Sequence, residues 1–217
     1  MKKLAKSTNK SVSEHLSSDM AISAKNHSFS GLPIIDDSAE VIQHFELQDI
    51  KELLKKIAVE PRIWLHVFHN NNHISTPDIT SVCIGCENKV HLICWSNDTS
   101  DEFGKFITAY KGQIYGHDLK SDYYAIIRNC HISAEEGMPC IFNTAYDTSV
   151  AAYLIDSQKK SYELSILMLD YFHVEFPSDK EISEEVATID MFGDVYETQG
   201  RLSKKIFIAS SKVIDSH

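Results

Sequence analysis

Apolar residues recur along this chain at two different spacings, and the change from one spacing to the other outlines the expected elements. Residues 47–57 carry leucine and isoleucine at helical spacing, whereas residues 62–68 alternate as a strand does. Two further strand-like runs, residues 81–87 and 89–95, are separated by Asn88 and its neighbours, which predict a tight turn. A helix followed by three successive strands indicates an antiparallel meander.

In the second half of the chain, helical and strand patterns alternate. Asp101 can cap a helix that leads into a short strand at residues 113–117, and a helix is expected at residues 119–129. A strand-like run at residues 140–144 precedes Asp147, which opens another helix, and the remainder is mostly helical. These patterns predict an α/β fold with a mixed sheet, an antiparallel meander followed by parallel strands, flanked by helices.

The two ends of the chain differ in composition from the middle. Residues 1–40 are rich in Ser, Lys, Asn and His without periodicity, so we expect a flexible tail or linker there and one domain over residues 41–217. A chain of 217 residues that is 43% hydrophobic can bury one sizeable core. The basic beginning is followed by no apolar run of signal-peptide or membrane-span length, and we therefore expect no membrane contact and a cytoplasmic location.

Charge and cysteine content limit the function further. The formal net charge of −10 argues against nonspecific binding to phosphates, so we expect this chain alone to bind DNA weakly, if at all. The five cysteines fit reduced thiols in a cytoplasmic protein. Cys83 and Cys86 spell C-x-x-C, but no second pair follows at ligand spacing and the surrounding pattern is that of a strand, which argues against a zinc or redox site.

Two longer stretches carry a resemblance to a known family. "GHDLKSDYYAI" (116–126) and "NTAYDTSVAAYLIDSQKKSYELSILMLDYF" (143–172) resemble, in order and spacing, the family patterns G-x-N-L-K-x-D and F-D-T-x-x-A-A-Y-L-L-D followed by S-x-x-L. These patterns belong to the 3′–5′ exonuclease (proofreading) domain of bacterial DNA polymerase I, the family-A polymerases. The resemblance covers about residues 42–215 and implies the ribonuclease-H-like 3′–5′ exonuclease fold.

The resemblance also implies a chemistry that can be tested position by position. The family hydrolyses phosphodiesters with two divalent metal ions, Mg²⁺ or Mn²⁺, held by converging carboxylates. Two carboxylates come from D-x-E on the first strand, one from the middle motif and one from Y-x-x-x-D on a late helix. Here His66 and Phe68 stand at the Asp and Glu positions, Asp122 matches the middle position, and Leu202 and Ile206 fall at the Tyr and Asp positions.

Asp122 is thus interpreted as the remnant of a metal site, because one carboxylate cannot hold two magnesium ions. The resemblance then implies no catalytic residue, no metal and no cofactor in this chain. We expect a catalytically degenerate exonuclease-like domain of a family-A DNA polymerase, with a structural or DNA-positioning role in replication and repair. Its partner would be the polymerase domain of the same parent chain, whose motifs are missing from these residues.

Two other functions remain open from the sequence. The first is an active, divergent metal-dependent 3′–5′ exonuclease that uses Asp122 together with acids such as Asp118, Asp190 or Asp194. The second is a free-standing interaction scaffold, with the acidic stretch after residue 178 as a docking face.

Structural roles compete with each of the chemical ones. Asp122 lies where a first-turn residue of a helix is expected, and Asp147 and Thr148 are candidate N-caps. A single histidine on an apolar strand, such as His66, is commonly a core residue, and the His-rich run at residues 69–73 is typical of a polar loop. Of the adjacent pair Tyr123 and Tyr124, which could stack a base, we expect one to face the core.

Overall fold

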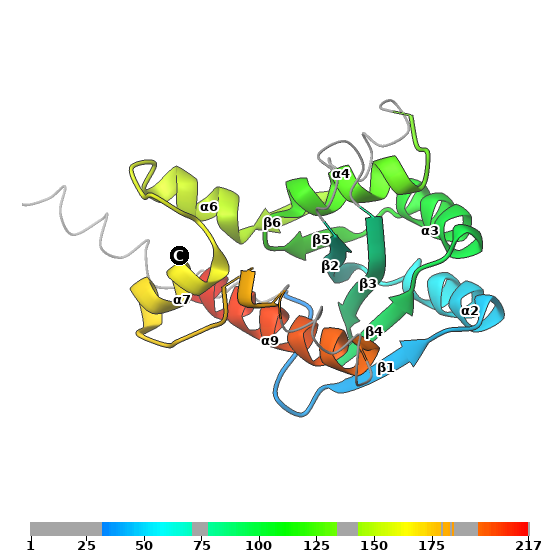
Figure 1. Cartoon of the computed structure of the whole chain (residues 1–217), viewed down its shortest axis with the longest axis horizontal. Helices are drawn as coiled ribbons and strands as arrows, with labels where there is room; N and C mark the ends of the chain where they lie inside the picture. The colour runs from blue at the N-terminus through cyan, green and yellow to red at the C-terminus, as the bar shows by residue number, and fades with distance from the viewer. Residues whose placement is uncertain are drawn as a thin grey trace, which may run out of the picture. The chain divides into compact units, whose positions relative to one another are not determined.

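A computed structural model describes residues 32–70, 78–133 and 143–216, except 179, 183 and 185–194. These residues belong to one compact unit, Leu32–His217. Its helices and strands are, in chain order (Figure 1), β1 (Glu40–His44), α2 (Leu47–Ile57), β2 (Arg62–Asn70), β3 (Asp78–Cys86), β4 (Lys89–Cys94), α3 (Asn97–Ala109), β5 (Gln113–Gly116), α4 (Leu119–Asn129), β6 (Thr144–Asp147), α6 (Thr148–Ile155), α7 (Leu164–Phe172) and α9 (Val195–Ser216).

The strands form one mixed sheet in the order β1-β4-β3-β2-β5-β6. β2, β3 and β4 are antiparallel neighbours, whereas β1 lies parallel to β4, and β5 and β6 continue the sheet in parallel beyond β2. The predicted meander and the parallel strands that follow it are therefore confirmed. The turn between β3 and β4 consists of Glu87 and Asn88, both at positive φ (49° and 56°), as a two-residue hairpin of the primed type requires.

Helices cover both faces of the sheet (Figure 1). Because successive side chains of a strand point to opposite faces, β2 contributes Ile63, Leu65 and Val67 to the core beneath α2, α3 and α4. It contributes Trp64 and Phe68 to the second core, which α6, α7 and α9 complete. The sheet is thus buried on both sides, as its parallel strands require.

Helix α9 crosses the second face of the sheet and approaches it closely. Phe207 stacks on Trp64 with ring centroids 5.9 Å apart and an interplanar angle of 22°. Gly85 on β3 permits this approach, because a Cβ atom there would lie only 2.8 Å from a ring carbon of Phe207. This packing fixes which residues of α9 face the ends of β2 and β3.

The structure differs from the sequence prediction at several boundaries. β1 was missed, and the core already includes Ile35 and Ala39, which are buried although they lie in the stretch expected to be a tail. The prediction of Asp101 as an N-cap was wrong: α3 begins at Asn97, and Ser96 accepts a hydrogen bond from the backbone N–H of Thr99. The predicted tail up to residue 31 lies outside the described residues.

Two further expectations concern the later part of the chain. β6 covers Thr144–Asp147, and most of the predicted strand at residues 140–144 lies outside the described residues. The prediction that the rest of the chain is mostly helical is confirmed for α7 and α9, whereas residues 173–178 are not helical. Within the part of the chain that the structure describes, no helix has the length and apolar character needed to span a bilayer.

Candidate functional site

Asp122 lies where strand β5 stops pairing with β2. β5 pairs with β2 only through Arg62, Ile63 and Trp64, so the backbone groups of β2 beyond Trp64 lack a strand partner on that side. The carboxylate of Asp122, from the first turn of α4, takes over this role: Oδ1 accepts a hydrogen bond from the backbone N–H of Val67 at 3.2 Å. The carboxylate therefore serves the sheet, and it does not cap its own helix.

The second oxygen of Asp122 faces His66. Oδ2 is buried without a hydrogen-bond partner, and it lies 3.8 Å from Nδ1 of His66, too far for a hydrogen bond. Burial raises the pKa of the Asp122 carboxyl well above its usual value, although the Val67 N–H opposes this change. Burial lowers the pKa of His66, and the neighbouring His117 and His69 lower it further. At neutral pH the imidazole is uncharged, so the two residues form no ion pair.

Phe68 supplies an apolar wall next to His66. It is buried, and its ring meets the His66 ring edge-on with centroids 4.8 Å apart. The strand is irregular directly after it, because the pairing register between β2 and β3 shifts between Phe68 and His69. A phenyl ring at this position offers no ligand for a cation, and an apolar environment penalises an unpaired charge.

One side of α9 carries Gln199, Ser203 and Phe207, which are four residues apart along the helix and lie against β3 and β2. Gln199 contacts Ser81, whose register partner on β2 is Phe68. Phe207 stacks on Trp64 one turn beyond Ser203.

Ser203 lies next to Cys83, the register partner of His66. Burial raises the pKa of the Cys83 thiol to about 12, and the hydroxyls of Ser203 and Ser81 oppose that rise. Ser203 and Gln199 thus contact the β3 register partners of His66 and Phe68, and neither carries a carboxylate. Leu202 and Ile206, which the family alignment had placed opposite the strand, are buried in the apolar core of this face.

Neutral hydrogen bonds connect α9 to the strands. Gln199 is fully buried; its Oε1 accepts from the Ser81 hydroxyl at 2.8 Å, and its Nε2 donates to the Thr80 hydroxyl at 3.0 Å. Thr80 in turn donates to the backbone carbonyl of Phe68 at 3.1 Å. Sequence patterns gave no indication of this network, because its members come from α9, β3 and β2. All side chains of this network, which links the helix to the strands, are uncharged.

Asp147 is engaged in capping two helices. Its side chain accepts from the backbone N–H of Ser149 at 2.9 Å, which confirms it as the N-cap of α6, whereas Thr148 is the first residue of that helix. Its two oxygens also accept from the backbone N–H groups of Asp118 (3.1 Å) and Leu119 (2.8 Å) at the start of α4. All of these bonds engage the carboxylate, so Asp147 serves as a structural acceptor.

Other candidate residues separate in space or lie outside the described residues. Cys83 and Cys86 point to opposite faces of β3, into different cores. Tyr123 is buried and Tyr124 is half-exposed beneath the Arg128 guanidinium, as expected for adjacent helical residues. Asp190, Asp194 and the last three residues of the His-rich run (71–73) are not described. Among the described residues, no group of three or more His, Cys, Asp or Glu side chains could hold a metal ion.

Comparisons with known proteins identify the fold. No family model matches the sequence, and no curated protein matches it. Among solved structures, the EXO domain of Aedes aegypti Nibbler is similar over 86% of this chain and 90% of that chain, with 8% identity and a TM-score of 0.54. Trypanosoma brucei RNase D in complex with GMP is similar over 81% of this chain and 57% of that chain, with 14% identity and a TM-score of 0.57.

A polymerase structure is similar as well, but less closely. Pol1 from M. smegmatis aligns with 80% of this chain and 26% of that chain, with 14% identity and a TM-score of 0.47. The chain therefore shares the fold of these exonuclease domains, the ribonuclease-H-like fold, with a mixed six-stranded sheet covered by helices on both faces.

Proposed function

We propose that this domain does not hydrolyse nucleic acid and acts instead as a structural module that positions a neighbouring domain or DNA. The observation that carries the proposal is the state of Asp122. It is the one carboxylate among the four expected ligand positions, and its Oδ1 accepts a hydrogen bond from the backbone of β2. A two-metal reaction needs converging oxygen ligands for both cations.

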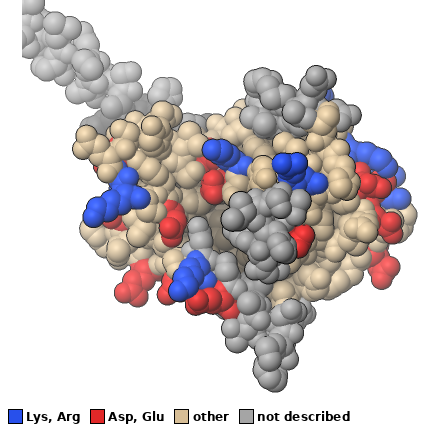
Figure 2. All heavy atoms as spheres, turned by 45° about the horizontal axis from the view of Figure 1, so that its top comes forward, with Lys and Arg blue, Asp and Glu red and all other residues tan. Residues whose placement is uncertain are grey.

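The proposal extends to the parent protein. The motif resemblance at residues 116–126 and 143–172 favours a family-A DNA polymerase, in which the domain would support the polymerase domain during replication and repair. Weak contact with DNA fits the surface: the face drawn in Figure 2 shows Lys and Arg interspersed with Asp and Glu among the described residues, and the chain carries a formal net charge of −10.

The test is release of nucleotides from a 3′-labelled single-stranded oligonucleotide with Mg²⁺ or Mn²⁺ present. We expect no release above background from the wild-type chain and the same result for Asp122→Ala. Release by the wild-type chain that Asp122→Ala abolishes would contradict the proposal and establish a divergent nuclease. Release that survives Asp122→Ala and stays with the chain over a further purification column would also contradict the proposal.

A further inference from the structure

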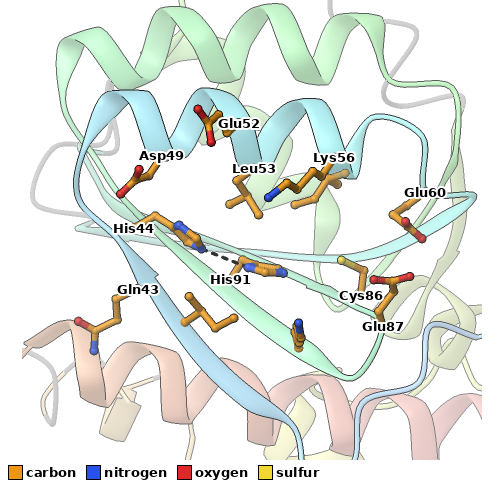
Figure 3. Close-up of a pocket in the computed structure, with 13 residues that line it drawn as sticks. Gln43, His44, Asp49, Glu52, Leu53, Lys56, Glu60, Cys86, Glu87 and His91 are labelled. Carbon is orange, nitrogen blue, oxygen red and sulfur yellow. Dashed lines mark hydrogen bonds between the residues drawn. The ribbon is translucent and has the colours of Figure 1, made fainter.

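A polar cavity lies at the β1 edge of the sheet, away from Asp122 (Figure 3). It has a volume of about 490 Å³ and lies between α2 and the strands β1 and β4. Two histidines form its floor, His44 from the edge strand β1 and His91 from β4, and their rings point toward one another. Asp122 and its neighbours contribute nothing to this cavity, so any ligand in it would be independent of the exonuclease-like site.

The strand register brings the two imidazoles together. Ile42 of β1 pairs with His91 of β4, and His44 pairs with Ile93, so the histidines are diagonal neighbours on one face of a parallel strand pair. Nε2 of His44 lies 3.1 Å from Nδ1 of His91. Because two neighbouring strands of one sheet hold the rings, the histidine pair is already formed without a bound ligand.

The separation of these nitrogens matches the requirement of one shared metal ion. With metal–nitrogen bonds of about 2.0–2.1 Å and tetrahedral angles, two imidazole nitrogens on one ion lie roughly 3.3–3.4 Å apart. The observed 3.1 Å differs from this by only a few tenths of an ångström. Binding of one ion would replace the hydrogen bond between the rings with two metal–nitrogen bonds.

We propose that His44 and His91 together bind one transition-metal ion of the class that prefers imidazole ligands, such as Zn²⁺ or Ni²⁺. In the metal-free pair one facing nitrogen carries the shared proton. On binding, that proton moves to the other nitrogen of the same ring, so both rings remain neutral and both facing lone pairs bind the ion. The binding step therefore requires no net loss of a proton from the protein.

The surroundings of the pair favour a cation. The lining holds two lysines, Lys56 and Lys89, against four carboxylates: Asp49, Glu52, Glu60 and Glu87. A cation is attracted into the cavity, and the carboxylates can accept hydrogen bonds from metal-bound water.

The expected site is open rather than closed. Within the described residues no third ligand converges with the two histidines, so water completes the coordination. We therefore expect weaker binding than at sites with four protein ligands. Mg²⁺, which prefers oxygen ligands, should not bind here.

The test is isothermal titration of the full chain with Zn²⁺ and, separately, Ni²⁺ at pH 7 in a buffer that does not bind metals. We expect one site that His44→Gln and His91→Gln each weaken at least tenfold. The control is His173→Asn, which changes an exposed histidine at a position with φ of 56°, where Asn is tolerated; it should leave this site unchanged.

Nuclear magnetic resonance of the wild-type histidine rings gives a readout that does not depend on variants. Zn²⁺ should change the nitrogen chemical shifts of both His44 Nε2 and His91 Nδ1, over the same range of metal concentration as in the calorimetry. Undiminished binding in both Gln variants, unshifted ring nitrogens, or no binding up to about 1 mM metal would each overturn the proposal.

Discussion

Asp122 occupies the place of a missing strand partner, and this role explains why a carboxylate persists in an otherwise apolar environment. The residue is 3% exposed, and its Oδ1 accepts the Val67 N–H that β5 does not reach. An unpaired backbone N–H buried at this point would cost about 1–3 kcal/mol. The acceptor is needed there, whereas the negative charge is not, because no cation or ion-pair partner faces the carboxylate in the described residues.

Replacing Asp122 tests that distinction. Asp122→Asn keeps an oxygen acceptor for Val67, so we expect it to leave the free energy of unfolding at pH 7 unchanged or raise it. Asp122→Ala removes the acceptor and should lower the free energy by about 1–3 kcal/mol. Urea unfolding of the three proteins measures this. Equal losses in both variants would show that the charge itself stabilises the fold.

The effect of pH on the Asn variant follows from the raised pKa of Asp122. In the folded state the carboxyl keeps its proton above its ordinary value of 3.8, while the unfolded chain releases it. Its contribution to stability is therefore present at low pH and is lost as pH rises toward the folded pKa. The stability of Asp122→Asn relative to wild type should grow as pH increases from 4 to 8.

At the scale of elements, α9 carries the features that sequence reasoning could least anticipate. Leu202 and Ile206 belong to the apolar stripe of α9, and Gln199 and Ser203 form the polar stripe next to it. Both stripes are buried, because the helix packs against both the sheet and α7. Helical periodicity reveals a buried side but not which part of it faces β2. That rotation is set by packing, such as Phe207 on Trp64.

The other elements show what patterns do reveal. Strands β2, β3 and β4 were predictable because their apolar alternation is long and an Asn marks the hairpin. β1 was not, because its five residues are exposed or half-buried and show no alternation. The resemblance located Asp122, but its partner Val67 comes from a strand far away in sequence, and a hydrogen bond of that range leaves no local signal.

Gln199 offers a test of the network that attaches α9 to the sheet. Gln199→Leu keeps an apolar body of similar size but leaves the buried Ser81 hydroxyl without its acceptor. We expect a loss of about 1–3 kcal/mol in the free energy of unfolding. The matched control on the same helix is Ser210→Ala, since the buried Ser210 hydroxyl has no hydrogen-bond partner among the described residues, and its loss should be neutral or stabilising. Similar effects of the two changes would show that the network contributes nothing specific.

At the scale of the whole molecule, buried histidines make the fold sensitive to acid. Burial lowers the pKa of four of them, to about 3 for His66 and about 4 for His91 and His117, with a smaller decrease for His44. In the unfolded chain these imidazoles titrate near 6.5. Their contribution to stability is complete above that pH and is lost as pH falls toward the folded values.

We therefore expect the free energy of unfolding to fall as pH decreases from 6.5 to 4.5, by about 1.4 kcal/mol per pH unit for each proton that only the unfolded chain binds. Denaturant titrations at several pH values measure the slope. His173→Asn, at an exposed site, should leave it unchanged. A stability that stays flat or rises over this range would mean that the buried histidines already carry protons in the fold.

The central claim is that an exonuclease fold persists here without its pair of catalytic cations. Binding of Mn²⁺, counted by electron paramagnetic resonance with the wild-type chain and Asp122→Asn, tests it most directly, because Mn²⁺ prefers the oxygen ligands that such a site requires. We predict that millimolar Mn²⁺ gives no bound ion that depends on Asp122, so the two proteins give the same count. One or two bound Mn²⁺ ions in the wild-type chain that Asp122→Asn removes would contradict the account.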